Sequence, residues 1–293
     1  MKETAMQTPD VTGFFDPETY TISYVVADPE TKVCAVIDSL LDFDQASGRT
    51  RTHSADKLIA FVRERGLSCA WIIDTHVHAD HLTAAPYIQE HLGGKTAIGD
   101  QIPVVQRVFG KIFNEGQSFH TDGSQFDHLM ADGETYFIGN IEARAIHTPG
   151  HTPACMSHLI GDALFVGDTI FMPDFGTARC DFPGGDAGTL FDSIQKLFAL
   201  PDETRMFLCH DYKAPGRDRF VWETTVGEQK RSNIHVKDGT SREAFIKMRN
   251  ARDATLDMPK LILPSVQINM RAGNMPEPED NGKRYMKIPI NAL

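Results

Sequence analysis

Apolar residues recur along this chain in two rhythms, one typical of buried strands and one typical of helices. Segments 19–27 and 33–38 are apolar over strand lengths and are separated by the turn sequence Asp28-Pro29-Glu30. Apolar side chains at helical spacing predict a helix that opens at Ser54 and stops at Gly66. The same spacing predicts helices over residues 83–92, 102–113, 186–200, 225–235 and 242–250. Because strands and helices alternate, the pattern predicts an α/β fold.

The segment that follows Pro215 does not differ in composition from the rest of the chain. It contains the apolar stretches Leu261-Ile262-Leu263-Pro264 and Ile288-Pro289-Ile290, and a charged stretch over 277–284 that predicts a surface loop. We therefore expect a single domain over residues 1–293, with a core over about 14–215 and a C-terminal extension over about 216–293 packed on it.

Charge and composition narrow the class of protein. The 293 residues carry a formal net charge of −11, which disfavours nucleic acid and anionic membranes as partners. No apolar run reaches the roughly 18 residues of a membrane span, and residues 1–10 are polar, unlike a secretory signal. The five cysteines are scattered, without a C-x-x-C pair, as is typical of a reducing compartment. We expect a cytoplasmic protein.

One short segment carries four side chains that can bind metal. It directly follows the apolar strand predicted over 70–73 and contains His76, His78, Asp80 and His81. Alternate residues of an extended segment point the same way, so His76 and His78 can aim at one region. Asp80 and His81 follow where the chain turns, and can face a second point nearby. A polar loop would rarely combine these four residue types at this spacing by chance.

Three later segments each place a similar side chain at or just after the end of an apolar strand. His151 lies in the sequence His147-Thr148-Pro149-Gly150-His151, Asp168 ends the apolar segment 163–168, and His210 ends the segment 206–210. Imidazole and carboxylate groups are the common protein ligands of zinc and of non-haem iron. The three later residues are therefore candidate metal ligands, in addition to those of segment 76–81.

The order His-x-His-x-Asp-His at a strand end, with the later histidines and aspartate, resembles the metal-binding signature of the metallo-β-lactamase superfamily. That resemblance implies a four-layer αββα sandwich with a short C-terminal appendage. Within the superfamily, the chain resembles the persulfide dioxygenases more than glyoxalase II, over residues of about 14–275. The resemblance rests on segments 75–83, 150–153, 176–182, 210–212, 224–230 and 269–273.

Segment 176–182 separates the two branches. Glyoxalase II typically has bulky aromatic residues where this chain has Asp181-Phe182, and the dioxygenases often read Gly-Arg-Thr-Asp-Phe there. This chain reads Ala178-Arg179-Cys180-Asp181-Phe182, and Ala154 stands where glycine is common. These departures bear on the fit of the substrate and not on the class of reaction.

The resemblance to persulfide dioxygenases implies a mononuclear Fe(II) site held by His76, His151 and Asp168. The enzyme would oxidise glutathione persulfide with dioxygen and water to sulfite and glutathione, a step in sulfide detoxification. Arg179 and Tyr212 match the family's glutathione-binding residues, and the resemblance also suggests a homodimer. The residues left over, His78, Asp80, His81 and His210, would orient the iron ligands through hydrogen bonds.

Residue types alone leave other interpretations open. The same four residues could bind a second metal, which would make the chain a glyoxalase II-like thioester hydrolase with zinc or a dinuclear pair. A non-catalytic binding or sensor module of the same fold is a weaker alternative, because the ligand set is intact. Asp38 lies at the end of a predicted strand. It could orient a metal ligand through a hydrogen bond or form a hydrogen bond within the core, and the sequence favours neither role. Cys155 and Cys180 lie near the motifs, but isolated cysteines are more often buried apolar groups.

Overall fold

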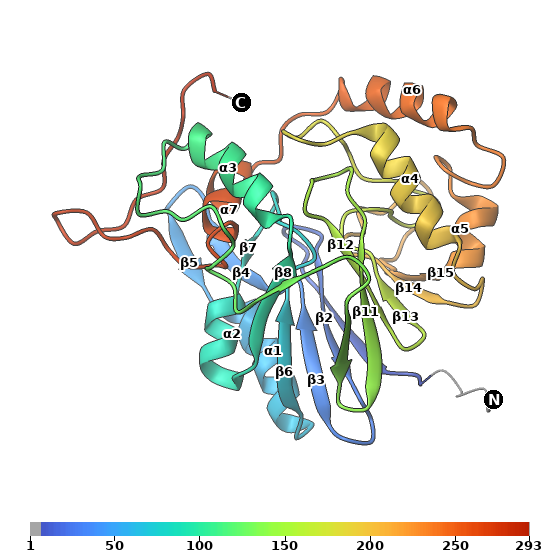
Figure 1. Ribbon diagram of the computed structural model, residues 1–293, viewed down its shortest axis with the longest axis horizontal. Coiled ribbons are helices and arrows are strands. Elements are labelled where there is room, and N and C mark those ends of the chain that lie inside the picture. Colours follow the sequence, from blue (N-terminus) through green and yellow to red (C-terminus); the bar gives the residue numbers. More distant parts are fainter. Residues whose placement is uncertain (1–6, 293) are drawn as a thin grey trace.

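The computed structural model describes residues 7–292, which form two β-sheets flanked by helices (Figure 1). Met1–Met6, at the start of the polar segment 1–10, lie outside the described residues. The first sheet has the order β1-β2-β3-β6-β8-β9 and the second the order β10-β11-β12-β13-β14-β15. The strands of the first sheet are β1 (Asp10–Phe15), β2 (Ile22–Ala27), β3 (Val33–Ile37), β6 (Ser68–Ile73), β8 (Lys95–Gly99) and β9 (His128–Met130). Those of the second are β10 (Thr135–Ile138), β11 (Ile141–His147), β12 (Met156–Ile160), β13 (Ala163–Phe165), β14 (Arg205–Phe207) and β15 (Glu223–Thr225).

Helices cover the outer face of each sheet. α1 (His53–Glu64) and α2 (Ala85–Leu92) pack on buried residues of β2, β3 and β6. On the other side, α4 (Ala187–Phe198) packs on β13 and β14, with α5 (Val226–Ser232) and α6 (Arg242–Asp253) beside it. The layers therefore run helix, sheet, sheet, helix (Figure 1). The predicted four-layer αββα sandwich is confirmed.

The strand β2 shows why its sequence is apolar at every position. Ile22, Tyr24 and Val26 point between the two sheets, where they meet residues of the second sheet such as Phe165. Val25 points the opposite way, toward α1. Successive side chains of a strand alternate between its faces, so a strand covered on both sides needs apolar residues throughout.

The predicted helices form with small shifts at their ends. The helix predicted over 225–235 stops at Ser232, because the side chain of Asn233 accepts hydrogen bonds from the backbone N–H groups of His235 and Val236 and turns the chain. The strand predicted over 19–27 begins at Ile22, since Tyr20 has a φ of 60° and cannot continue a strand. α3 (Ile102–Ile112) forms as predicted.

Some elements were not predicted. A small sheet of order β5-β4-β7 contains β4 (Leu40–Asp44), β5 (Arg49–Arg51) and β7 (Leu82–Thr83). Its strands are short and β5 is exposed, so no apolar alternation marks them. The short helix α7 (Ile262–Asn269) was also missed; it packs with α3 in one buried cluster.

The C-terminal extension only partly matches the expectation. Its helices α5, α6 and α7 pack on the sandwich, and residues 277–285 form an exposed loop as predicted. The expectation that segment 288–290 packs on the core is wrong, because Ile288 is 71% and Ile290 79% exposed. The side chain of Gln267 donates a hydrogen bond to the Lys287 carbonyl oxygen and accepts one from the Lys287 N–H, and the two isoleucines beyond Lys287 lie in solvent.

Strands of both sheets end at a common edge. β6, β11, β13 and β14 are each followed there by one of the predicted metal-binding segments (Figure 1). The two sheets are joined at this edge by a backbone bridge between Thr21 and His210 and by a 2.7 Å hydrogen bond from Ile22 N to the Cys209 carbonyl. The fold thus gathers segments that are up to 134 positions apart, counting from His76 to His210.

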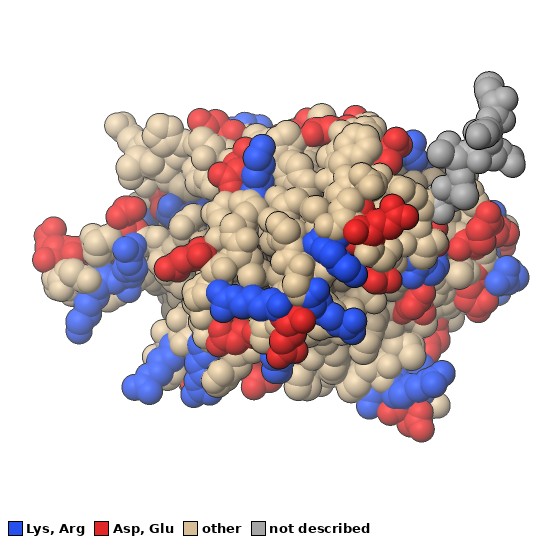
Figure 2. All heavy atoms as spheres, turned by 90° about the horizontal axis from the view of Figure 1, so that it is seen from below, with Lys and Arg blue, Asp and Glu red and all other residues tan. Residues whose placement is uncertain are grey.

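The surface is charged and mixed. Seen from below, acidic and basic side chains are interspersed over the face shown in Figure 2. Among residues 7–292, none of the helices combines the length and the apolar content that a membrane crossing requires.

Candidate metal centre

The structure brings His76, His151 and Asp168 together. Asp168 Oδ2 lies 3.9 Å from His76 Nε2 and 3.6 Å from His151 Nε2, and the three side chains are 1%, 4% and 11% exposed. Each comes from a different strand end: β6, the loop after β11, and the loop after β13. Two imidazoles and one carboxylate around a common point form the facial donor set that non-haem Fe(II) prefers.

A second group of donors lies on the other side of Asp168. Asp168 Oδ1 lies 3.4 Å from His210 Nε2, and His210 Nε2 lies 3.4 Å from Asp80 Oδ2. His81 belongs to this group, with its Nδ1 atom 3.3 Å from Asp80 Oδ2. One oxygen of Asp168 therefore faces the first group and the other oxygen faces the second.

A hydrogen bond to Asp38 fixes the orientation of the His78 ring. The Nε2 atom of His78 donates to Asp38 Oδ1 at 2.9 Å, so its Nδ1 atom is the one turned toward the other imidazoles. Burial alone would lower the pKa of His78, but the carboxylate of Asp38 raises this pKa to about 9. Asp38 also accepts hydrogen bonds from the backbone N–H and the hydroxyl of Thr75. Asp38 therefore orients a predicted metal ligand through a hydrogen bond, which is one of its two predicted roles.

Hydrogen bonds also fix the rings of His76 and His151. The Nδ1 atom of His76 lies 3.0 Å from Thr75 Oγ1, whose hydrogen goes to Asp38, so the imidazole is the donor. The Nδ1 atom of His151 donates to the carbonyl oxygen of Arg179 at 2.8 Å. Because a neutral imidazole carries one N–H, these contacts leave both Nε2 lone pairs directed at Asp168.

Unpartnered buried atoms test whether a metal fits this site. Among the described residues, ten buried side-chain nitrogen or oxygen atoms make no hydrogen bond, and five of them belong to this cluster. They are His76 Nε2, His78 Nδ1, His81 Nε2, His210 Nε2 and Asp168 Oδ1. Leaving a buried polar atom unpaired costs about 1–3 kcal/mol. Five such atoms in one buried cluster of imidazole and carboxylate groups, on either side of Asp168, fit a metal centre.

Two glycines allow the ligand loops to approach their neighbours. Gly167, before Asp168, has a φ of +51°, and a Cβ atom there would lie 2.5 Å from Thr75 Oγ1. Gly150, before His151, has a φ of +135°, and a Cβ atom would lie 2.4 Å from the Leu190 backbone. Any side chain at either position would displace a predicted ligand.

Sequence reasoning missed two residues that support the site. Asn269 donates its side-chain amide to the carbonyl oxygens of His78 and His81, at 2.9 and 2.8 Å, and accepts from Thr83 N. Thr21 Oγ1 lies 3.1 Å from Asp80 Oδ2 and 3.4 Å from His81 Nδ1. The motif over 269–273 was the only signal for Asn269, and nothing in the sequence pattern marks Thr21.

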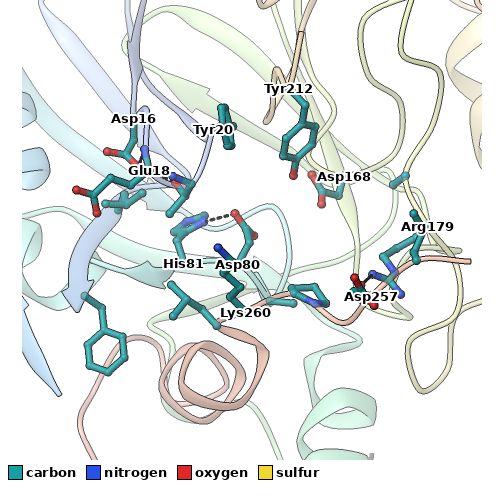
Figure 3. A pocket seen from close by; sticks show the side chains of 18 of the residues that line it. Asp16, Glu18, Tyr20, Asp80, His81, Asp168, Arg179, Tyr212, Asp257 and Lys260 are labelled. Carbon is teal, nitrogen blue, oxygen red and sulfur yellow. Dashed lines mark hydrogen bonds and ion pairs between the residues drawn. The ribbon is translucent and has the colours of Figure 1, made fainter. Parts of the chain in front are cut away.

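The cluster lies in the wall of a cavity of about 870 Å³. Side chains from both halves of the chain line it (Figure 3). Apolar residues near the metal-binding end include Phe171, Phe175 and Phe182. This volume suits a small-molecule ligand, and the apolar walls would exclude water from it.

Arg179 lines this cavity, but much of its guanidinium is already engaged. Its Nε and Nη2 atoms donate to the two oxygens of Asp181 at 2.6 and 2.7 Å, and Nη1 donates to the carbonyl oxygen of Asp257 at 2.7 Å. The hydrogen bond to Asp181 raises the pKa of Arg179. A guanidinium has five N–H groups, so two remain for a ligand. The glutathione-binding role of Arg179 stays a prediction, and Asp181 would position it.

Tyr212 lines the same cavity, and Asp168 lies between it and Arg179 in Figure 3. Its ring stacks beside that of His210, with centroids 5.4 Å apart, and its hydroxyl points toward Asp168 (Figure 3). Although 37% of the residue is exposed, desolvation of its hydroxyl raises the pKa of Tyr212 well above its ordinary value, and Asp80 and Asp168 add to this. The group is therefore a neutral hydroxyl that can donate a hydrogen bond. Its role toward glutathione also stays a prediction.

Cys155 and Cys180, the cysteines near the motifs, are buried, as predicted. Burial raises the pKa of the Cys155 thiol to about 12 and raises the pKa of Cys180 as well. Reactive cysteines need a thiolate, which these two environments disfavour.

Comparison with known proteins places the chain in a family. The model of the metallo-beta-lactamase superfamily matches residues 17–210. A probable metallo-hydrolase of Burkholderia pseudomallei (strain 1710b) is 56% identical over 97% of this chain and 99% of its own length. Glyoxylase B2 of Dictyostelium discoideum is 50% identical over 96% of each chain. Mitochondrial persulfide dioxygenase ETHE1 of Homo sapiens is 28% identical over 88% of this chain and 87% of its own. The crystal structure of ETHE1 from Myxococcus xanthus has a TM-score of 0.71 and 31% identity, and covers 90% of this chain and 100% of its own.

The chain belongs to the metallo-β-lactamase superfamily. Its relatives carry the names of a metallo-hydrolase, a glyoxylase and a persulfide dioxygenase, so membership defines a metal-dependent enzyme family without defining the reaction. The predicted resemblance to the persulfide dioxygenases and to glyoxalase II is confirmed.

Proposed function

We propose that this protein is a glutathione-dependent persulfide dioxygenase with a single Fe(II) held by His76, His151 and Asp168. The observation that carries the proposal is the position of Asp168 Oδ2, 3.6–3.9 Å from the two Nε2 atoms at the wall of a ligand-sized cavity. Three protein ligands on one face leave adjacent positions for a sulfur ligand and for dioxygen. The likeness to ETHE1 in sequence and in structure supports the same reaction.

The proposed reaction is balanced without a further reductant. Glutathione persulfide, dioxygen and water give glutathione, sulfite and two protons, and the terminal sulfur is oxidised while dioxygen is reduced. A bound ferrous ion would supply the redox chemistry that joins dioxygen to this sulfur. The protein's own residues bind and orient the substrate and limit the access of water.

Residues that line the cavity would contact both the substrate and the predicted metal ligands. The carbonyl oxygen of Arg179 holds the Nδ1–H of His151, so the segment that would bind glutathione also orients one iron ligand. Tyr212 would donate its hydroxyl to the bound persulfide. Phe182, whose ring centroid lies 5.1 Å from that of His151, shields the ligand from water.

A second candidate function has a specific observation in its favour. His78 Nδ1, His81 Nε2 and His210 Nε2 are buried and unpaired, as is Asp168 Oδ1, the oxygen that faces this second group. This arrangement suits a second metal, and a dinuclear or zinc site would favour a glyoxalase II-like thioester hydrolase that activates water. The names of the relatives at 50–56% identity also favour a hydrolase. No comparable observation favours the non-catalytic module, and the homodimer and the cytoplasmic location stay predictions.

Oxygen consumption separates the two reactions. Protein reconstituted anaerobically with Fe(II) is given glutathione persulfide in an oxygen electrode, and sulfite is measured at the end. We expect one sulfite per dioxygen consumed, and no activity in His151→Ala, which controls for contaminating enzymes. Rapid hydrolysis of lactoylglutathione without uptake of oxygen would instead establish the hydrolase.

A further inference from the structure

The cationic side chains of the cavity differ in how far they are already paired. The five that line it are Arg51, Arg179, Arg249, Arg252 and Lys260. Arg249 is buried and pairs with Asp253, and Arg179 pairs with Asp181. Among the described residues, Arg51, Arg252 and Lys260 line the cavity without an ion pair to a carboxylate, and Lys260 is the one of these three that lies two residues before α7. An unpaired cation inside a binding cavity is available to an anionic ligand.

The position of Lys260 relative to the metal centre is fixed by its neighbours in sequence. α7 begins two residues later, at the buried Ile262, and ends at Asn269. Asn269 is hydrogen bonded to the backbone of His78 and His81, so the helix is anchored on the metal-binding loop. The backbone of Lys260 is therefore held near the predicted ligands, although its side chain is long and exposed.

Lys260 and Arg179 both line the cavity and lie apart from one another. Figure 3 shows the amino group of Lys260 rising toward Asp80, while Arg179 lies beyond Asp257. In the same view Asp168 lies between Tyr212 and Arg179, to the right of Lys260. A ligand whose sulfur reaches Asp168 could thus extend one arm toward each cation.

Glutathione has this distribution of charge. Its sulfur lies on the central cysteine, and it carries one carboxylate on the glycine end and another on the γ-glutamyl end. Arg179 has two N–H groups left, enough for one carboxylate. The other carboxylate needs a second cation, because a carboxylate left unpaired in a cavity would lose its hydration.

We propose that Lys260 is a substrate-binding residue that holds one carboxylate of the thiol peptide, while Arg179 holds the other. This inference rests on the proposed function for the identity of the peptide. It gives the enzyme a preference for persulfides with a carboxylate on each side of the sulfur. A persulfide with a single carboxylate would bind through one cation only.

Binding of glutathione sulfonate, an unreactive anionic analogue, tests the inference independently of turnover. Its affinity for the iron-loaded protein is measured by calorimetry for the wild type, Lys260→Gln, Lys260→Arg and Lys260→Glu. Lys57→Gln, at an exposed position on α1, is the matched control. We expect Lys260→Gln to weaken binding about 3- to 10-fold, between the effect of an exposed ion pair and that of a charged hydrogen bond. Lys260→Arg should retain most of the affinity, Lys260→Glu should lose more, and the control should match the wild type.

A second ligand shows whether the carboxylates are responsible. With the diethyl ester of glutathione sulfonate, Lys260→Gln should bind as well as the wild type, because the partner of Lys260 is masked. Wild-type affinity of Lys260→Gln and Lys260→Glu for the free acid would overturn the inference and leave the proposed function intact. A wild-type protein that does not bind glutathione sulfonate would overturn both.

Discussion

Asn269 Nδ2 lies 2.8 Å from the carbonyl oxygen of His81, across 188 positions of sequence. The same amide bonds the carbonyl of His78, so one side chain near the C-terminus closes the turn that carries two predicted ligands. The C-terminal extension is therefore part of the support of the metal centre.

Asn269→Asp should destabilise the protein and weaken its hold on metal. A carboxylate cannot donate to the carbonyl oxygens of His78 and His81, and two buried acceptors would lose their partners. At about 1–3 kcal/mol for each of the two acceptors, we expect the free energy of unfolding to fall by about 2–6 kcal/mol. Asn274→Asp, at an exposed position with only a local hydrogen bond, is the control. Denaturant titration measures the free energy of unfolding, and a competitive chelator assay measures the affinity for metal. Unchanged values of both in Asn269→Asp would show that the hydrogen bonds of Asn269 to His78 and His81 are dispensable.

Metal stoichiometry should separate the two groups of donors. If one iron is bound, His76→Ala, His151→Ala and Asp168→Ala should each lose it, together with nearly all activity. His210→Ala should keep most of its iron, because His210 lies on the other side of Asp168. Elemental analysis of the four purified variants gives the answer. Two metals in the wild type, with equal loss in His210→Ala, would support the dinuclear hydrolase.

Gly167→Ala should disturb the centre through a steric contact. An alanine there must adopt a φ of +51°, and its Cβ atom would meet Thr75 Oγ1 at 2.5 Å. Gly133→Ala is a matched control, since its φ is +78° and nothing lies within 4 Å of its Cβ position. The backbone cost of about 1–2 kcal/mol is common to both, and overpacking should add about 1–3 kcal/mol in Gly167→Ala alone. Equal unfolding midpoints of the two variants would contradict this close approach.

His158 should contribute to a loss of stability in acid. Burial lowers its pKa to about 4, whereas an unfolded histidine titrates near 6.5. A lowered histidine pKa means that the stabilising neutral form persists above about pH 6.5 and that stability falls as the pH drops from there toward 4. Between pH 7.5 and 4.5, the free energy of unfolding of the wild type should fall by about 2–3 kcal/mol more than that of His158→Gln.

The comparison is made by denaturant titration at both pH values. His120→Gln, at an exposed position, controls for the loss of an imidazole as such. Parallel pH dependences of the wild type and His158→Gln would show that the buried ring is not responsible.

The sequence alone determined the fold class and the residues of the centre. Strand periodicity and the placement of imidazole and carboxylate groups at strand ends are local properties, so His76, Asp168 and His210 could be selected before their contacts were known. Strands of one sandwich that end at one edge must bring such side chains close. The helices over 54–65 and 186–200 could also be predicted from local sequence, because the spacing of apolar residues on one face is enough to define an amphipathic helix.

Only the tertiary structure decided how the centre is supported and how its cavity is charged. Asn269 and Thr21 act through hydrogen bonds to residues 59 to 191 positions away, which no local pattern records. The hydrogen bond from Arg179 to the carbonyl oxygen of Asp257, 78 positions away, and the absence of an ion-pair partner for Lys260 among residues 7–292 likewise depend on segments that are distant in sequence. Sequence periodicity reports which face of an element is buried, whereas a cavity arises where several elements meet. The ligands could therefore be read along the chain, but the geometry that selects their substrate could not.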